Sequence, residues 1–232
     1  MKNTYRGLTG HQLKLIAMVC MTLDHIGLLL LPRLTILRVI GRLAFPVYAY
    51  MLTEGCIYTR SMGKRLGVLV LSAAVCQGVY LVALGSLYMY ILVTFSAGVG
   101  LIWLAKWAQN RKTPYAWGAL LLGILLAFFI SEILPRLLKG TDFGVDYGFV
   151  GIALPLCLYL CKSKGLKLAV LAVGLSLLVI DTWYIQVFAL LSLPLLALYN
   201  GQRGKGNFKW GFYLYYPLHL AVLYAIALLL QI

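Results

Sequence analysis

The chain has 232 residues, of which 62% are hydrophobic and 11% are charged, and its mean hydropathy is +0.92. A soluble domain carries roughly 25% charged residues, and one of this size could not bury so much apolar surface. The composition therefore excludes a soluble globular protein and predicts an all-α, polytopic membrane helix bundle with a single domain over residues 1–232. The net charge of +14 is expected to reflect topology and lipid contact rather than nucleic acid, because the basic residues flank apolar segments.

About nine apolar segments follow one another, each near the length of a bilayer crossing. They lie near residues 12–31, 34–58, 66–84, 87–107, 115–138, 147–161, 166–180, 182–200 and 209–231. The sixth and seventh segments are short. They are either half-helices or tilted helices, or their true ends differ from these bounds. No small-residue cleavage site follows the first apolar run, so we expect this segment to be retained and not removed as a signal peptide.

Lysine and arginine side chains mark alternate connections between these segments. Fifteen of the twenty lie there in groups of three: Lys2, Arg6, Lys14; Arg60, Lys64, Arg65; Lys106, Arg111, Lys112; Lys162, Lys164, Lys167; Arg203, Lys205, Lys209. By the positive-inside rule, the N-terminus is expected in the cytoplasm of a bacterial inner membrane and the C-terminus outside. Four of the six acids lie on the predicted outer side: Glu132, Asp142, Asp146 and Asp181. This bias either marks the side from which an acceptor enters or arises by chance.

The five cysteines all fall inside predicted helices: Cys20, Cys56, Cys76, Cys157 and Cys161. Cys157 and Cys161 share a helix face, but their α-carbons lie at the edge of disulfide reach and two ligands do not make a metal site. The sequence therefore predicts reduced packing cysteines and no metal.

The first apolar segment carries Asp24 and His25 side by side near its middle. A charged side chain at that depth costs roughly 3 kcal/mol or more unless the protein stabilises it, which makes it a candidate functional residue. Neighbours on a helix point about 100° apart, so the two residues are expected to face different partners. An imidazole is suited to general base catalysis near neutral pH, which favours His25 for chemistry.

Two other segments bring polar side chains to the same depth. With about 1.5 Å of rise per residue, Asp24 and His25 lie roughly 18 Å from the cytoplasmic end, and Arg42 lies roughly 12 Å below the outer end of its own segment. Tyr216 and His219 of the last segment fall near this level. We therefore predict one site in which Arg42 pairs with Asp24. The alternative is a scaffold, in which the ion pair and the histidines only hold the helices together.

A glycine-rich basic loop, YNGQRGKGNFK over residues 199–209, lies on the predicted cytoplasmic side. Glycines let backbone amides turn toward an anion, and Arg203 and Lys205 supply charge for phosphates. The alternative is a topogenic loop that contacts lipid headgroups.

Four ordered motifs resemble the TraX family, typified by the F-pilin acetylase of conjugative plasmids. They are LKLIAMVCMTLDHIG, LRVIGRLAFPVYAYMLTEG with Tyr58-Thr59-Arg60 after it, QVFALLSLPLLALYNGQRG, and FYLYYPLHL. The resemblance covers the first sixty and the last fifty residues, while residues 66–180 resemble the family only as membrane helices. The matching positions are Asp24-His25, Gly41-Arg42 with Phe45-Pro46, Glu54, Asn200-Gly201 with Arg203-Gly204, and Pro217 with His219.

The resemblance implies a membrane-bound acetyltransferase that takes acetyl-CoA as acyl donor. The implied acceptor is an amine, on the N-terminus of a membrane or exported protein or on an amino sugar. The expected catalytic residues are His25, Asp24, Arg42, His219 and Tyr216, with His219 or Tyr216 polarising the thioester carbonyl. The expected residues for acetyl-CoA are Arg60, Lys64, Asn200, Arg203 and Lys205. The alternative function is a small proton-coupled transporter that uses the same buried polar residues.

Overall fold

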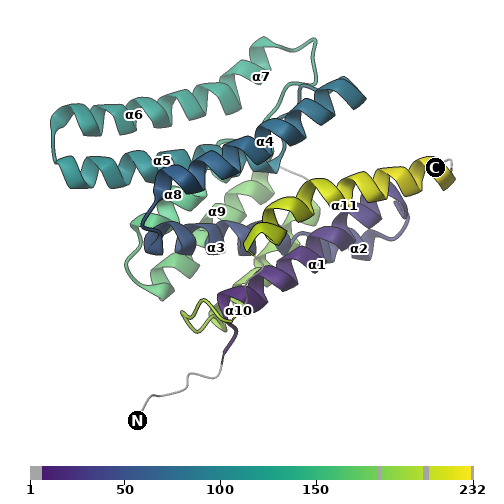
Figure 1. The fold of residues 1–232 in the computed structure, drawn as a ribbon, viewed down its shortest axis with the longest axis horizontal. Coiled ribbons are helices and arrows are strands. Elements are labelled where there is room, and N and C mark those ends of the chain that lie inside the picture. Colours follow the sequence, from purple (N-terminus) through teal and green to yellow (C-terminus); the bar gives the residue numbers. More distant parts are fainter. Residues whose placement is uncertain (1–6, 182–183, 206–208, 231–232) are drawn as a thin grey trace. The chain divides into compact units, whose positions relative to one another are not determined.

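A computed structural model describes residues 7–181, 184–205 and 209–230, and within them it is built of helices joined by short connections (Figure 1). Lys2, Arg6 and the start of the eighth predicted segment, residues 182–183, lie outside the described residues. The elements are α1 (Gly10–Leu29), α2 (Thr35–Gly41), α3 (Ala44–Tyr58), α4 (Met62–Leu84), α5 (Ile91–Arg111), α6 (Pro114–Phe128), η1 (Phe129–Ile133), α7 (Leu134–Leu137), α8 (Gly148–Leu160), α9 (Lys164–Asp181), η2 (Tyr184–Leu191), α10 (Ser192–Ala197) and α11 (Lys209–Leu230).

The chain divides into two compact units. One, the split unit, combines Met1–Met51 with Lys164–Ile232, and the other, the inserted unit, comprises Leu52–Ser163. That residues 1–232 act as a single functional domain remains a prediction. The split unit matters most for function, since it contains every predicted catalytic residue.

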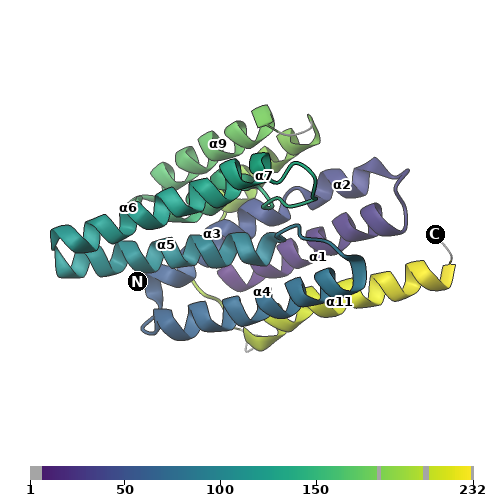
Figure 2. The ribbon, with the colours of Figure 1, turned by 90° about the horizontal axis from the view of Figure 1, so that it is seen from above.

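In the split unit, α1 and α2 form a helical hairpin, and α11 packs along α1 (Figures 1 and 2). Two glycines permit the close approach of α1 to α2. A β-carbon on Gly27 would lie 2.9 Å from the Leu37 β-carbon, and one on Gly41 would overlap the Asp24 side chain. The absence of a side chain at position 41 therefore makes room for the acid of the candidate site.

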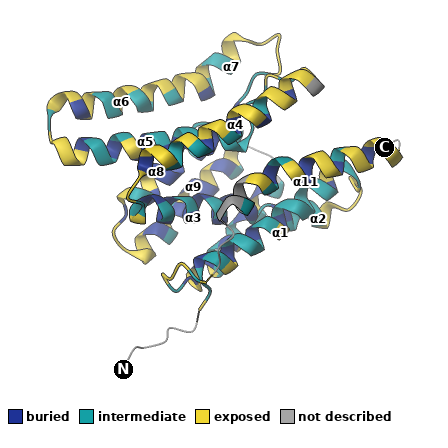
Figure 3. Cartoon of the chain, viewed as in Figure 1, coloured by how far each residue is buried: buried dark blue, intermediate teal, exposed yellow. Residues whose placement is uncertain are grey.

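In the inserted unit, α5 packs against α4, α6 and α8 (Figure 1). Gly98 of α5 faces α8 closely, since a β-carbon there would lie 3.0 Å from the Ile152 carbonyl oxygen. Many residues along α4 and α6 are exposed (Figure 3). Among them are the apolar Leu71, Val82, Leu121 and Leu122. Exposed aliphatic faces of this extent are expected where helices contact lipid.

Five helices of the described part are long and apolar enough to cross a membrane: Gly10–Leu29, Thr35–Tyr58, Met62–Val82, Ile91–Arg111 and Pro114–Leu137. Shorter apolar helices cover Gly148–Leu160, Ile185–Ala197 and Leu214–Leu230. The all-helical membrane architecture is confirmed. The count of nine crossings and the cytoplasmic N-terminus remain predictions. All five cysteines are free, and all but the exposed Cys157 are buried.

Three predicted segments differ from continuous α-helices. The segment at 34–58 breaks at Arg42 and Leu43 between α2 and α3, because Pro46 has no amide hydrogen to donate to the Arg42 carbonyl. The segment at 115–138 contains the π-helix η1, and the segment at 182–200 begins as the 3₁₀ helix η2. These irregular backbones were not visible in the hydropathy pattern.

Candidate functional site

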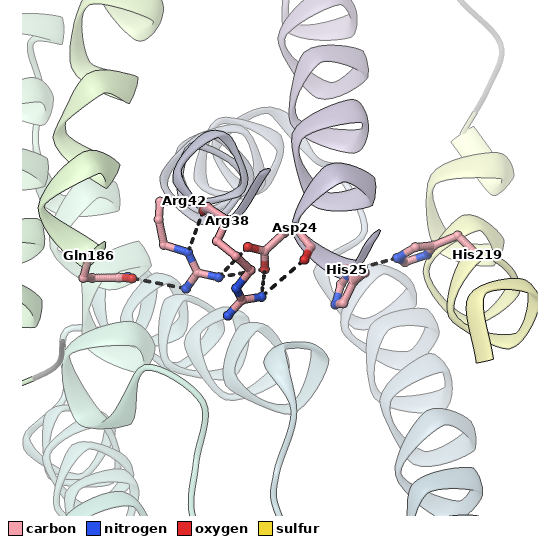
Figure 4. Close-up of polar contacts among 6 residues, drawn as sticks. All are labelled: Asp24, His25, Arg38, Arg42, Gln186 and His219. Atoms are coloured by element: carbon pink, nitrogen blue, oxygen red, sulfur yellow. Dashed lines mark hydrogen bonds and ion pairs between the residues drawn. The ribbon is translucent and has the colours of Figure 1, made fainter. Parts of the chain in front are cut away.

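Asp24 of α1 is held by two arginines from the neighbouring α2 hairpin arm and the turn after it (Figure 4). Nη2 of Arg42 donates to both carboxylate oxygens, at 2.6 and 2.7 Å. Nη1 of Arg38 lies 3.0 Å from Oδ2 of the same carboxylate. The predicted pair of Asp24 with Arg42 is confirmed, and Arg38 is a second partner that the sequence analysis did not assign.

Asp24, Arg38 and Arg42 form a carboxylate cluster, which extends through Arg42 toward η2. Nη1 of Arg42 donates to Oε1 of Gln186 at 3.3 Å, and Gln186 is almost fully buried. The side chains of Asp24 and Arg42 are only 16% and 13% exposed, while that of Arg38 is 25% exposed. Ion pairs that are this well buried interact strongly, since little water screens them.

His25 points away from the carboxylate cluster, toward α11 (Figure 4). Its Nδ1 lies 3.0 Å from Nε2 of His219, and Nδ1 of His219 lies 2.8 Å from the backbone carbonyl oxygen of Tyr215. The expectation that Asp24 and His25 face different partners is therefore confirmed. It follows that His219 has both ring nitrogens engaged within the helix pair, which leaves it no nitrogen to polarise a thioester carbonyl while these contacts last.

Tyrosines of α11 surround the histidine pair. The Tyr215 ring stacks on the His219 ring at a centroid distance of 5.0 Å, and its hydroxyl lies 2.6 Å from the Thr22 hydroxyl of α1. Tyr216 is buried and meets the His25 ring edge-on at 6.3 Å. Both candidates for polarising a carbonyl therefore lie beside His25, with ring-centroid distances of 4.9 Å for His219 and 6.3 Å for Tyr216.

The basic loop of residues 199–205 packs against the start of α1. Amides of Gly10 and His11 donate to the Gln202 and Arg203 carbonyls, at 2.8 and 3.0 Å. A helix N-terminus has unpaired amides that need such acceptors. The loop carbonyls therefore cap α1, together with the Thr9 side chain, which accepts from Gln12.

Asn200 shapes this loop from within. Its Nδ2 donates to the Gly7 carbonyl at 3.2 Å, and its Oδ1 accepts from the Gln202 amide at 2.9 Å. Gly201 and Gly204 adopt positive φ angles of 75° and 81°, a conformation that favours glycine. Asn200 thus has a structural task, whereas Arg203 and Lys205 are exposed.

The remaining candidates for acetyl-CoA, Arg60 and Lys64, belong to the inserted unit. Both are exposed, one just before α4 and the other in its first turn. Whether they act with Arg203 and Lys205 stays a prediction.

Sequence reasoning missed Arg38, Gln186, Thr22 and Tyr215. Arg38 carried a usable signal, since it lies one helical turn before Arg42 and shares its face. Gln186, Thr22 and Tyr215 carried none, because uncharged polar residues are common in membrane helices. Together the residues place a partly buried imidazole pair beside a carboxylate that is ion-paired to two arginines, an arrangement suited to proton transfer.

The model of the family described as TraX protein matches residues 9–227 of this chain. The chain belongs to the TraX family. A curated relative, the probable fimbrial assembly protein FimC (serogroup H1) of Dichelobacter nodosus, is 28% identical over 96% of this chain and 97% of its own length. The uncharacterized protein RP591 of Rickettsia prowazekii (strain Madrid E) is 58% identical over 38 residues, which are 16% of this chain and 15% of RP591. No solved structure matches the TraX chain.

Proposed function

We propose that this TraX-family protein is a membrane-embedded acetyltransferase that moves an acetyl group from cytoplasmic acetyl-CoA to an acceptor amine. The observation that carries the proposal is the pairing of the partly buried His25 with the buried His219 beside the Asp24 carboxylate, which is ion-paired to two arginines. A base that is shielded from bulk water and lies beside an ion-paired carboxylate is suited to acyl transfer to an amine.

In the proposed reaction, the neutral acceptor amine attacks the thioester carbonyl carbon. His25 takes the proton that the amine nitrogen loses, and the carbon–sulfur bond breaks as the amide forms. The CoA sulfur then takes this proton from His25 and leaves as the free thiol. Tyr216 is the candidate donor to the developing oxyanion, and Asp24 with Arg42 and Arg38 keeps the α1–α2 hairpin in place.

The acyl donor would approach from the predicted cytoplasmic side. Its phosphates would be bound by Arg203 and Lys205, with Arg60 and Lys64 as further candidates. Exposed arginine and lysine side chains suit this task, because phosphate accepts several charge-assisted hydrogen bonds. Asn200 would act indirectly by holding the loop conformation.

The acceptor is proposed to be an amine on a membrane or exported protein, with the N-terminus of a pilin-like subunit as the first candidate. The relative named as a fimbrial assembly protein supports this choice, because it aligns over nearly its whole length. An amino sugar is the other acceptor to be tested, and N-acetylation is favoured over O-acetylation. Cytoplasmic-membrane residence is part of the same proposal.

The test uses inverted inner-membrane vesicles that contain the protein and their native membrane proteins and lipids. Acetyl-CoA labelled in the acetyl group is added, and label in the protein and lipid fractions is counted. Wild-type protein should transfer label, and His25→Ala should abolish the transfer at equal folded protein. His11→Gln is the matched control, because His11 is the one histidine without an assigned role. Full activity in His25→Ala would refute the proposal.

The transporter alternative rests on the same buried polar residues. Proteoliposomes separate the two functions: an acetyltransferase should be stabilised thermally by acetyl-CoA, whereas a proton-coupled carrier should acidify or alkalinise the lumen when its solute is supplied. Thermal stabilisation by acetyl-CoA, but not by acetate with free adenosine, supports the transferase.

A further inference from the structure

We infer that His219 is a positioning residue, which fixes the tautomer of His25 so that Nε2 of His25 is the unprotonated nitrogen available to act as the base. This inference rests on the proposed function for its catalytic meaning, but it concerns an atom-level property of the helix pair α1 and α11 that can be measured without any reaction.

The first step concerns His219 itself. A backbone carbonyl oxygen can only accept hydrogen bonds, so the contact of 2.8 Å from His219 Nδ1 to the Tyr215 carbonyl requires a hydrogen on Nδ1. A neutral imidazole carries one hydrogen, and Nε2 of neutral His219 is therefore a lone-pair acceptor.

The second step concerns His25, which must supply the hydrogen that Nε2 of His219 accepts. Nε2 of His219 lies 3.0 Å from Nδ1 of His25, and two lone pairs at that distance would repel. Nδ1 of neutral His25 must therefore carry the hydrogen and donate it. By the same one-hydrogen rule, Nε2 of His25 keeps its lone pair. In free histidine the hydrogen prefers Nε2, so the helix pair enforces the less common tautomer on His25.

The surroundings reinforce this direction of hydrogen bonding. Tyr215 stacks flat on His219, with an interplanar angle of 6°, and its hydroxyl contacts Thr22 at 2.6 Å. These contacts hold the His219 ring in the orientation that its two hydrogen bonds need. His219 is buried, so water does not offer an alternative partner.

The direct test is a nitrogen-15 spectrum of protein labelled at histidine, in detergent micelles. The chain has three histidines, and the single variants His11→Gln and His219→Gln assign the signals. We expect His25 to show a protonated Nδ1 and an unprotonated Nε2 when neutral. A His25 signal with the hydrogen on Nε2 would overturn the inference.

Two matched variants separate positioning from packing. The amide of His219→Gln places an acceptor near the original Nε2, within reach of His25, whereas the shorter His219→Asn places its amide near the original Nδ1, within reach of the Tyr215 carbonyl only. We expect His219→Gln to keep the His25 tautomer and most of kcat. We expect His219→Asn to lose both, with kcat lowered on the order of 100-fold or more.

The outcomes distinguish the two proposals. Equal kcat and equal His25 spectra in the Gln and Asn variants would overturn the positioning role of His219. The expected spectra without any acetyl transfer by the wild type would instead refute the acetyltransferase proposal and leave the tautomer assignment standing.

Discussion

One nitrogen of Arg42, Nη2, contacts both oxygens of the Asp24 carboxylate, at 2.6 and 2.7 Å. Arg38 reaches the same carboxylate from one turn earlier, at 3.0 Å. The acid therefore contacts two cations at once, and losing it removes an ion-pair partner from both arginines. The three residues are consequently not equivalent in what their loss would cost.

Removal of the acid should be the most damaging change in this cluster. Asp24→Asn leaves two guanidinium groups in a low-dielectric site and should lower the free energy of unfolding by about 3–5 kcal/mol. Arg42→Gln leaves Asp24 paired with Arg38 and should cost less, about 1–3 kcal/mol. Denaturation in mixed micelles measures both, with Arg33→Gln in the exposed connection as the control. An equal loss for the two site variants would contradict this ranking.

A methyl group at position 41 should disturb the site without changing any polar residue. Gly41→Ala would place its β-carbon against the Asp24 carboxylate, and overpacking of this kind typically costs about 1–3 kcal/mol. Acetyl transfer should fall together with stability. Gly63→Ala in α4 is the matched control, because a β-carbon there meets nothing within 4 Å. It should be neutral or stabilising, since alanine is the better helix former.

The charges of the basic loop should affect the binding of acetyl-CoA and not the rate of the chemical step. Arg203→Gln and Lys205→Gln should each raise the KM for acetyl-CoA roughly two- to fivefold, as expected for about 0.5–1 kcal/mol per exposed charge contact. Their effects should shrink at high salt, because solvent-exposed charges are screened. Lys162→Gln, an exposed lysine on the same predicted side, is the control. A fall in kcat at unchanged KM would contradict the assignment.

The side-chain oxygen of Asn200, which accepts from the Gln202 amide, should by itself preserve part of the loop conformation. Asn200→Asp keeps the oxygen that accepts from the Gln202 amide, whereas Asn200→Ala loses both contacts. The KM for acetyl-CoA should therefore rise more in the alanine variant than in the aspartate variant. Steady-state kinetics with the two proteins side by side measures the difference, and identical KM values would contradict a loop-shaping role.

Asp142, in the connection between α7 and α8, gives the fold a pH dependence. The Ser86 hydroxyl and the Leu87 amide donate to its carboxylate and hold the pKa of Asp142 below its ordinary value of 3.8. A lowered pKa means that the stabilisation is complete above the ordinary value and is lost as the pH falls through the lowered one. The melting temperature of Asp142→Asn should thus lie below that of the wild type at pH 7, and the gap should close in acid. A gap that is constant down to acid pH would contradict this.

The sequence was sufficient for the pairing of Asp24 with Arg42 and for the nearness of His25 to His219, because helix rise converts sequence position into depth. It could not supply the break after α2 or the 3₁₀ geometry of η2, since both depend on local hydrogen bonding that hydropathy does not record. Arg38 was missed although its spacing of four residues from Arg42 predicts a shared helix face.

The roles of Asn200 and His219 needed atomic contacts. A glycine-rich basic loop is compatible with anion binding by its backbone, but the loop carbonyls accept from the first amides of α1. Likewise, two histidines at one depth are compatible with either of them acting on substrate. The engagement of both His219 nitrogens is what distinguishes their tasks.

The division of the chain into a split and an inserted unit has a consequence for biosynthesis. Asp24, Arg38 and Arg42 are translated within a short hairpin, so the carboxylate can pair with both arginines before the inserted unit emerges from the ribosome. His25 must wait for α11, more than a hundred residues later, to gain His219. A nascent chain thus carries the paired acid first, and the histidine pair forms only once α11 has been made.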